Sequence, residues 1–174
     1  MTIREIVVVP DPVLRKKAKA VTQFDEKLQT LIDDMVETMR AAPGVGLAAP
    51  QIGVLERVIV VEYYENEDDE DDEEVGNPPK KLYTIVNPVI TRKSVEMEEG
   101  PEGCLSIPGY LGDVNRHLSI TIKALTRHGQ PITLKLKDWT ARIFQHEIDH
   151  LEGVLFTDLA SKIWKPDEPI EDRV

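Results

Sequence analysis

Two histidines four residues apart, with a glutamate directly after the first, occur at His146, Glu147 and His150. On a helix, residues four apart lie on the same face, so both imidazoles can reach one ion. Glu147 can then contact a water on that ion without binding the ion itself. The segment therefore predicts a helix that carries two ligands and one acid–base residue of a metal site.

Two histidines leave this site short of a ligand, because a catalytic zinc-type centre uses three protein ligands and one open position. One known pattern continues with a glycine and a third histidine; the chain has Gly153, but Phe156 stands where the histidine should be. A second pattern takes a glutamate downstream. Of Glu152, Glu168 and Glu171, the last two lie in a short proline-containing tail with little helical character, so both are poor candidates.

Cys104, the single cysteine, is the better candidate for the third ligand. It cannot form a disulfide within the chain, so it is either a small buried apolar residue or a chemically active thiolate. One thiolate and two imidazoles suit Zn²⁺ or Fe²⁺ and exclude an oxygen-ligated ion such as Ca²⁺. Gly103 beside it would allow close approach of the backbone to a substrate or metal.

A third segment, Gly44 to Gln51, combines two glycines with two alanines. Such a composition predicts a bare, tightly folded loop, on which the amide of Gln51 offers a hydrogen-bond donor. The alternative is structural: a helix end followed by a turn, which the glycines and Pro50 already explain.

The pattern of apolar residues predicts a single α+β domain with antiparallel or mixed sheets. We expect one or two helical turns over 13–18, and a helix that Asp25 caps and that runs over 28–39 to near Gly44. Residues 138–150 should form a C-terminal helix capped by Asp138. Strands are expected at 57–64, 82–86 and 89–91, and alternation predicts a hairpin of 119–124 and 132–136 with its turn at 127–130.

The net charge of −11 comes mostly from residues 65–74, which hold nine carboxylates. We expect 65–80 to be an acidic surface loop and 165–174 a C-terminal tail, within one catalytic domain over 1–174. The chain has no long stripe of lysine and arginine, so no direct nucleic-acid site is expected. It also lacks a secretory signal and an apolar run of about 20 residues, which favours a cytoplasmic protein without membrane contact.

In their order and separation, these segments resemble those of the peptide deformylases. That family has a GxGLAAxQ loop, an EGCxS segment and a QHExDH helix, which here are 44–51, 102–106 and 145–150. The opening at 11–14 and the Asn87-Pro88 pair are also similar, so the resemblance covers nearly the whole chain.

The resemblance implies removal of the formyl group from N-terminal formylmethionine of new polypeptides, with release of formate. It implies that Cys104, His146 and His150 bind one divalent ion, most often Fe²⁺, with Zn²⁺, Ni²⁺ or Co²⁺ as substitutes. A metal-bound water or hydroxide would attack the formyl carbon, with Glu147 as general base and then general acid. The Gln51 side chain and the Leu105 backbone N–H would stabilise the developing oxyanion.

The resemblance also implies where the substrate binds. Backbone groups around Val45, Gly46 and Gly103 would pair with the peptide in strand fashion, and Val45 and Ile143 would contact the methionine side chain near His146. Because the substrates are N-formylmethionyl nascent chains, the enzyme could work close to the ribosome. Glu102 and Arg116 resemble an ion pair that supports the cysteine loop.

Two residues on the C-terminal helix differ from many bacterial members: Trp139 and Arg142 replace aliphatic residues there, which predicts a narrower or more polar substrate pocket. Two other functions remain open from the residues. The same helix could serve a zinc endopeptidase that takes its third ligand elsewhere, or a structural metal module in which Glu147 is only a helix charge.

Overall fold

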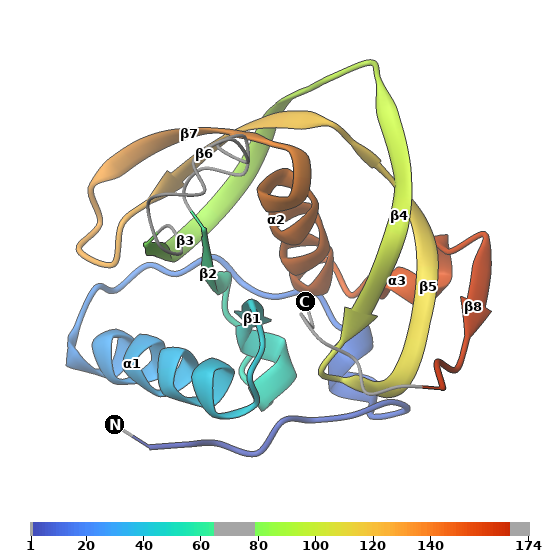
Figure 1. The fold of residues 1–174 in the computed structure, drawn as a ribbon. Helices are drawn as coiled ribbons and strands as arrows, with labels where there is room; N and C mark the ends of the chain where they lie inside the picture. Colours follow the sequence, from blue (N-terminus) through green and yellow to red (C-terminus); the bar gives the residue numbers. More distant parts are fainter. Residues whose placement is uncertain (1, 65–78, 168–174) are drawn as a thin grey trace.

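The chain folds into a strand-rich body with helices near both ends, which confirms the predicted α+β class. The computed structural model describes residues 2–64 and 79–167 (Figure 1). The helical elements are η1 (Pro12–Arg15), α1 (Glu26–Ala41), η2 (Ala49–Ile52), α2 (Asp138–Leu151) and α3 (Phe156–Leu159). The strands are β1 (Gly46–Ala48), β2 (Val58–Tyr64), β3 (Lys80–Lys93), β4 (Met97–Cys104), β5 (Ile107–His117), β6 (Ser119–Leu125), β7 (Pro131–Lys137) and β8 (Lys162–Trp164).

The strands form two sheets in which neighbouring strands are antiparallel. The five-stranded sheet has the order β1-β2-β3-β6-β7, and the three-stranded sheet has the order β4-β5-β8. β1 and β4 are each the outermost strand of their sheet, so each has one edge without a partner strand in the described part of the chain. Both of these strands lie beside α2 (Figure 1).

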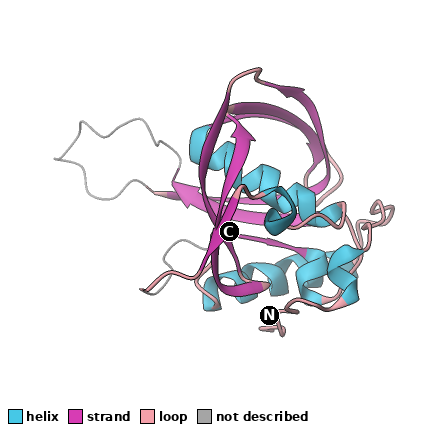
Figure 2. Ribbon diagram, turned by 90° about the vertical axis from the view of Figure 1, so that its right-hand side faces the viewer, coloured by secondary structure: helices cyan, strands magenta, loops and turns pink. Residues whose placement is uncertain are grey.

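β2 lies between the two long helices, which explains its continuous apolar run. Side chains alternate along a strand, so Val58 and Val60 pack in one cluster with residues of α1, while Ile59 and Val61 pack in another with residues of α2. A strand that is buried on both faces carries apolar side chains on both, so its sequence does not alternate between apolar and polar residues. The two helices accordingly lie on opposite sides of the sheet (Figures 1 and 2).

α2 contacts both sheets, since it packs against β1, β2, β6 and β7 and also against β5. Its polar residues are buried with the apolar ones, including Gln145, His146, Glu147 and His150. Gln145 joins α2 to β5: its Oε1 accepts from the backbone N–H of His117 at 3.1 Å, and its Nε2 donates to the carbonyl of the same residue at 2.9 Å. The helix is thereby fixed between the sheets.

Several predicted elements are confirmed. The hairpin of β6 and β7 has its turn at 126–130, and Asp25 caps α1 by accepting from the N–H of Leu28 at 3.1 Å. The expected turns after Asp11 are a 3-10 helix at Pro12–Arg15. The acidic run at 65–74 lies outside the described residues. Of the expected loop and tail, Pro79 and 165–167 lack regular structure, and Lys80 already belongs to β3.

Other predictions were wrong in detail. The two strands expected around Asn87-Pro88 are one strand, β3, with a bulge there; Asn87 has a φ of 51° and its side chain bonds the backbone of Val21. Asp138 was expected to cap α2, but the helix begins at Asp138 and Lys137 holds the cap position. The φ of Asp138 is 54°, which is not a helical value. A helix start defined by dihedral angles would therefore fall one residue later than the start defined by hydrogen bonds.

The sequence also gave no sign of the three-stranded sheet. β4 and β5 are rich in glycine, proline and charged residues, which have low strand propensity. The segment 44–51 is not simply a loop, because it contains β1 and η2. None of the described helices combines the length and apolar character needed to cross a membrane.

Candidate metal centre

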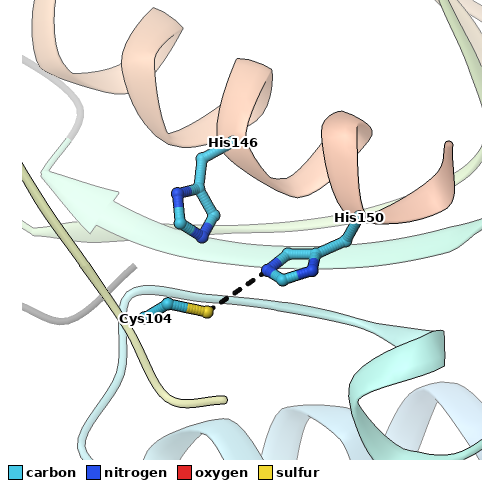
Figure 3. Close-up of side chains that lie close together, drawn as sticks. All are labelled: Cys104, His146 and His150. Carbon is cyan, nitrogen blue, oxygen red and sulfur yellow. Dashed lines mark hydrogen bonds between the residues drawn. The ribbon is translucent and has the colours of Figure 1, made fainter. Parts of the chain in front are cut away.

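Cys104, His146 and His150 converge on one point, although the cysteine is more than 40 residues away along the chain (Figure 3). One donor atom from each lies within 4.8 Å of the other two, and all three residues are buried. The Sγ of Cys104 is 3.3 Å from Nε2 of His150. The chain therefore brings its only thiol to the two imidazoles on α2.

The spacing of these donors fits a single metal ion. With a Zn–S distance of about 2.3 Å and Zn–N of about 2.0 Å, two donors at a tetrahedral angle lie about 3.5 Å apart. Nε2 of His146 is buried and bonds no acceptor or donor in the described residues, as expected for an atom that serves an ion. Sulfur and imidazole nitrogen suit Zn²⁺, Fe²⁺ and related ions.

Local structure explains why these side chains meet. The two histidine rings come from successive turns of α2 and their centroids are 5.0 Å apart. Cys104 ends β4 at an irregularity, where the pairing with β5 shifts register between Gly103 and Cys104. Such a bulge redirects a side chain, and here it directs the thiol toward α2.

Glu102 orients His146. The imidazole Nδ1 lies 2.9 Å from Oε1 of Glu102, and because an ionised carboxylate only accepts, Nδ1 is the donor and Nε2 is the ring nitrogen left to face an ion. Burial alone would raise the pKa of Glu102, but hydrogen bonds from Arg116 and His146 outweigh it and lower the pKa to about 2. The Glu102–Arg116 ion pair implied by the resemblance is present, with Nε and Oε2 2.9 Å apart.

Glu147 is fully buried and neither carboxylate oxygen bonds another side chain or backbone group of the described residues. It faces Gly46 on β1, where a Cβ would lie only 2.7 Å from Oε1. Burial, followed by the charge of Glu102, raises the pKa of Glu147 well above its usual value. Proton transfer in such a site uses a carboxyl group within reach of the reacting atoms, and Glu147 is the carboxyl group buried beside Gly46.

The charges of the ligands depend on the ion. Burial, followed by the nearby Glu147 carboxylate, raises the pKa of the Cys104 thiol far above its usual range. Burial also lowers the pKa of His150 well below its usual value, with His146 and Arg116 acting in the same direction. The site therefore disfavours a free thiolate and a charged imidazole, and a bound cation would convert the thiol to thiolate.

Gln51 lies next to the cluster. Its Oε1 accepts from the N–H of Ala48 at 2.9 Å, which fixes the amide, and its Nε2 lies 3.1 Å from Oγ of Ser106 and 3.6 Å from Sγ of Cys104. The amide nitrogen thus lies beside the thiol of Cys104. Ser106, which the sequence offered only as part of the EGCxS segment, is the neighbour that holds it there.

The other residues expected at the site lie around this centre. Val45 and Ile143 are buried in the same apolar cluster, between β1 and α2. Gly46 lies on β1, Gly103 on β4, and Leu105 is buried in the turn between β4 and β5. Arg142, one of the two residues expected to shape the substrate pocket, donates to Glu102 at 2.8 Å.

Known proteins resemble this chain over most of its length. The family model described as Polypeptide deformylase matches residues 3–165. The peptide deformylase of Symbiobacterium thermophilum is 47% identical over 163 residues, covering 94% of this chain and 69% of that protein. The peptide deformylase of Desulforudis audaxviator is 42% identical over 168 residues, covering 97% of this chain and all of the relative.

Solved structures show the same similarity. The crystal structure of peptide deformylase from Thermotoga maritima matches with a TM-score of 0.81 and 40% identity, over 93% of this chain and all of that chain. The peptide deformylase of Legionella pneumophila matches with a TM-score of 0.79 and 45% identity, over 92% of this chain and 87% of that one. A zinc endopeptidase, which the helix alone allowed, is not supported by these relatives. The chain belongs to the peptide deformylase family.

Proposed function

We propose that Cys104, His146 and His150 bind one divalent ion, at which the protein hydrolyses the formyl amide of N-formylmethionine. The reaction is that of a peptide deformylase, a metal-dependent hydrolase that removes the formyl group from the start of new polypeptides. The observation that carries the site assignment is the convergence of one thiol and two imidazoles within 4.8 Å. When bound, the ion acts as a Lewis acid and lowers the pKa of a coordinated water, which supplies the nucleophile.

Fe²⁺ is the ion we propose for this site, with Zn²⁺, Ni²⁺ or Co²⁺ as substitutes. One thiolate and two neutral imidazoles form a donor set that all four ions accept. His146 is oriented by the hydrogen bond between its Nδ1 and Glu102, which leaves Nε2 as the ring nitrogen that would bind the ion. A carboxylate behind a ligating histidine fixes the ring and increases its basicity.

Glu147 takes the proton released from the attacking water and returns it to the departing amine. Its carboxyl group is buried, and Gly46 permits the backbone of β1 to lie against it. The Nε2 of Gln51, held by Ala48 and Ser106, and the backbone N–H of Leu105 donate to the oxyanion that develops. The amide of Gln51 is held by two hydrogen bonds in the free protein, which supports its role as a preorganised donor.

The substrate peptide binds as an added strand between the two sheets. β1 and β4 are outermost strands; Gly46 lies on β1 directly after Val45, and Gly103 lies on β4 next to Cys104. Backbone pairing of this kind reads the chain direction without reading the side chains. The methionine side chain then packs against Val45 and Ile143, which lie in one apolar cluster.

The whole chain acts as one catalytic domain, since α2 contacts both sheets and carries two of the ligands. The substrate is a nascent chain, so we place the enzyme in the cytoplasm close to the ribosome. Sedimentation with translating ribosomes tests this placement: the protein should move into the ribosome fraction at low salt and leave it after release of the nascent chains.

The decisive experiment is formate release from a formyl-Met peptide by protein purified without oxygen and loaded with Fe²⁺. Oxygen is excluded because an iron-bound thiolate is open to oxidation. We expect stoichiometric formate and a free amino terminus, with the internal peptide bonds intact. Cleavage of internal bonds without formate would overturn the assignment.

A further inference from the structure

Arg142 is a charged residue buried inside the protein, one helical turn before His146. Its side chain is 7% exposed. The guanidinium Nη1 donates to Oε2 of Glu102 and to the carbonyl of Val114, both at 2.8 Å. Nη2 donates to the carbonyl of Glu98 at 2.7 Å. One side chain of α2 is thereby bonded to both β4 and β5.

The partner that matters most is Glu102, because it also holds His146. Oε1 of Glu102 accepts from Nδ1 of His146 and from Nη2 of Arg116, each at 2.9 Å. Oε2 accepts from Nε of Arg116 at 2.9 Å and from Arg142. Each oxygen thus has two donors, and the plane of the carboxylate is fixed from three directions.

The charges of this buried group balance. Arg116 also bonds Asp149, with Nη1 and Oδ2 2.6 Å apart. Two guanidinium groups therefore face two carboxylates, those of Glu102 and Asp149. Without Arg142, the group would carry one uncompensated negative charge in a site removed from water, and the carbonyls of Glu98 and Val114 would lose a donor.

We propose that Arg142 is a positioning residue for the metal centre: it fixes the Glu102 carboxylate, which in turn sets the ring of His146 so that Nε2 points at Cys104 and His150. The inference rests on the three metal ligands proposed above. It assigns to Arg142 a role in holding the ion, in place of the predicted role in the substrate pocket.

Gly100 provides the space for this arrangement. A Cβ at Gly100 would lie 3.0 Å from Nη2 of Arg142 and 3.1 Å from its Cζ. On another side, the ring of Trp139 lies 5.9 Å from the guanidinium, three residues away on the same helix. The position of the Arg142 guanidinium therefore requires a residue without a side chain at Gly100, and a substitution at Gly100 should displace Arg142.

The competing interpretation is that Arg142 contacts substrate. Gly100, Trp139 and Arg142 do border a hollow of about 220 Å³ between α2 and the β4–β5 hairpin. If this hollow receives part of the substrate, a change at Arg142 should alter KM for the peptide. If Arg142 serves the ion, the change should alter metal release while KM stays the same.

The test uses Arg142→Met and Arg142→Lys in the full-length protein loaded with Co²⁺. Arg127→Met is the control, because Arg127 also bonds a carboxylate, Asp33, in a region remote from the ligands. We measure the rate of Co²⁺ transfer to a chelator, the visible spectrum of bound Co²⁺, and KM for a formyl-Met peptide. Loss of a partner behind a ligating histidine weakens metal binding by about 10- to 100-fold.

We therefore expect Arg142→Met to release Co²⁺ at least about tenfold faster and with an altered spectrum, at unchanged KM. Lysine keeps the charge but loses the planar fork, so Arg142→Lys should restore little. The control should match the wild type. A raised KM with unchanged Co²⁺ release would assign Arg142 to the substrate, and lower thermal stability alone would make it merely structural; either result overturns the proposal.

Gly100→Ala gives an independent test that leaves Arg142 in place. Gly100→Ala should also accelerate Co²⁺ release. The double variant should release Co²⁺ no faster than Arg142→Met, because both changes break the same contact, that of Arg142 with Glu102. Additive effects would contradict the proposal. A failure of the proposed function would show instead in the wild type, as missing formate release or missing Co²⁺ binding.

Discussion

The backbone of Gly46 lies directly against the carboxyl group of Glu147: a Cβ on the glycine would stand 2.7 Å from Oε1 and 3.0 Å from Cδ. Real Cβ atoms do not approach an oxygen this closely, so one of the two must move. Since Glu147 is fully buried on a helix held between two sheets, its carboxyl group has little room to yield. The glycine of β1 thus limits where the carboxyl group of Glu147 can lie.

Replacing Gly46 with alanine should therefore reduce kcat by about 100-fold while the metal content stays the same, because small displacements of a reacting group have effects of this size. Gly109→Ala is the control. Apart from its chain neighbours, no atom of residues 2–64 and 79–167 lies within 4 Å of a Cβ at Gly109, although its φ of 85° makes the change slightly destabilising. Wild-type kcat in Gly46→Ala, measured by formate release, would show that the close approach is unimportant.

Glu147→Gln should keep the ion and lose the reaction. The amide is of similar size, so α2 is undisturbed, but it cannot accept the proton of the attacking water. We expect a loss in kcat of about 10² to 10⁴, with the metal-to-protein ratio unchanged. Glu152→Gln serves as the matched control, because Glu152 follows the same helix and pairs with Arg57 at the surface. Equal rates in the two variants would remove Glu147 from the mechanism.

Cys104→Ala should have the opposite pattern and lose the ion itself. Two imidazoles remain, which is one ligand fewer than such centres use. After dialysis against a weak chelator, we expect Cys104→Ala to retain less than about a tenth of the metal that Glu147→Gln retains after the same treatment. Loss of a residue that merely supports a ligand already weakens metal binding by about 10-fold, and loss of the ligand itself should weaken it at least as much. Full occupancy in Cys104→Ala, determined by elemental analysis, would refute the assignment of the thiol as a ligand.

The part of the site that lies on one helix could be predicted from the sequence, because the spacing of His146 and His150 is a local property. The link to Cys104 depended on counting ligands and on family resemblance, since no local pattern relates β4 to α2. The role of Arg142 could not be predicted. Its partners Glu98, Glu102 and Val114 lie 28 to 44 positions away, and only the folded chain brings them together.

In the fold, too, the elements with a local sequence pattern could be predicted, and those that depend on distant contacts could not. β6 and β7 alternate apolar and polar residues, since only one face is buried, and the hairpin was predicted correctly. β4 contains Gly100, Pro101 and Gly103 and three glutamates, which argue against a strand. Those residues have other tasks: Gly100 makes room for Arg142, and Glu102 holds His146.

Asp34 on α1 is 4% exposed and holds the N-terminal segment, since it accepts from the N–H of Thr2 at 2.8 Å and from Nε of Arg4 at 2.9 Å. Burial alone would raise the pKa of Asp34, but these hydrogen bonds and the charge of Arg4 outweigh it and lower the pKa. A pKa that is lower in the folded than in the unfolded state means that the ionised form stabilises the fold.

The contribution of Asp34 should therefore be complete above its unfolded-state pKa of about 3.9 and should be lost as the pH falls through the lower folded-state value. We expect Asp34→Asn to reduce the free energy of unfolding by about 1–2 kcal/mol at pH 7 and pH 5, and by progressively less below about pH 4. The neighbouring Asp33→Asn, which breaks a more exposed pair with Arg127, should cost below about 1 kcal/mol. Urea unfolding of the three proteins across this pH range checks the prediction, and a difference that grows as the pH falls would show that the sign of the pKa shift is wrong.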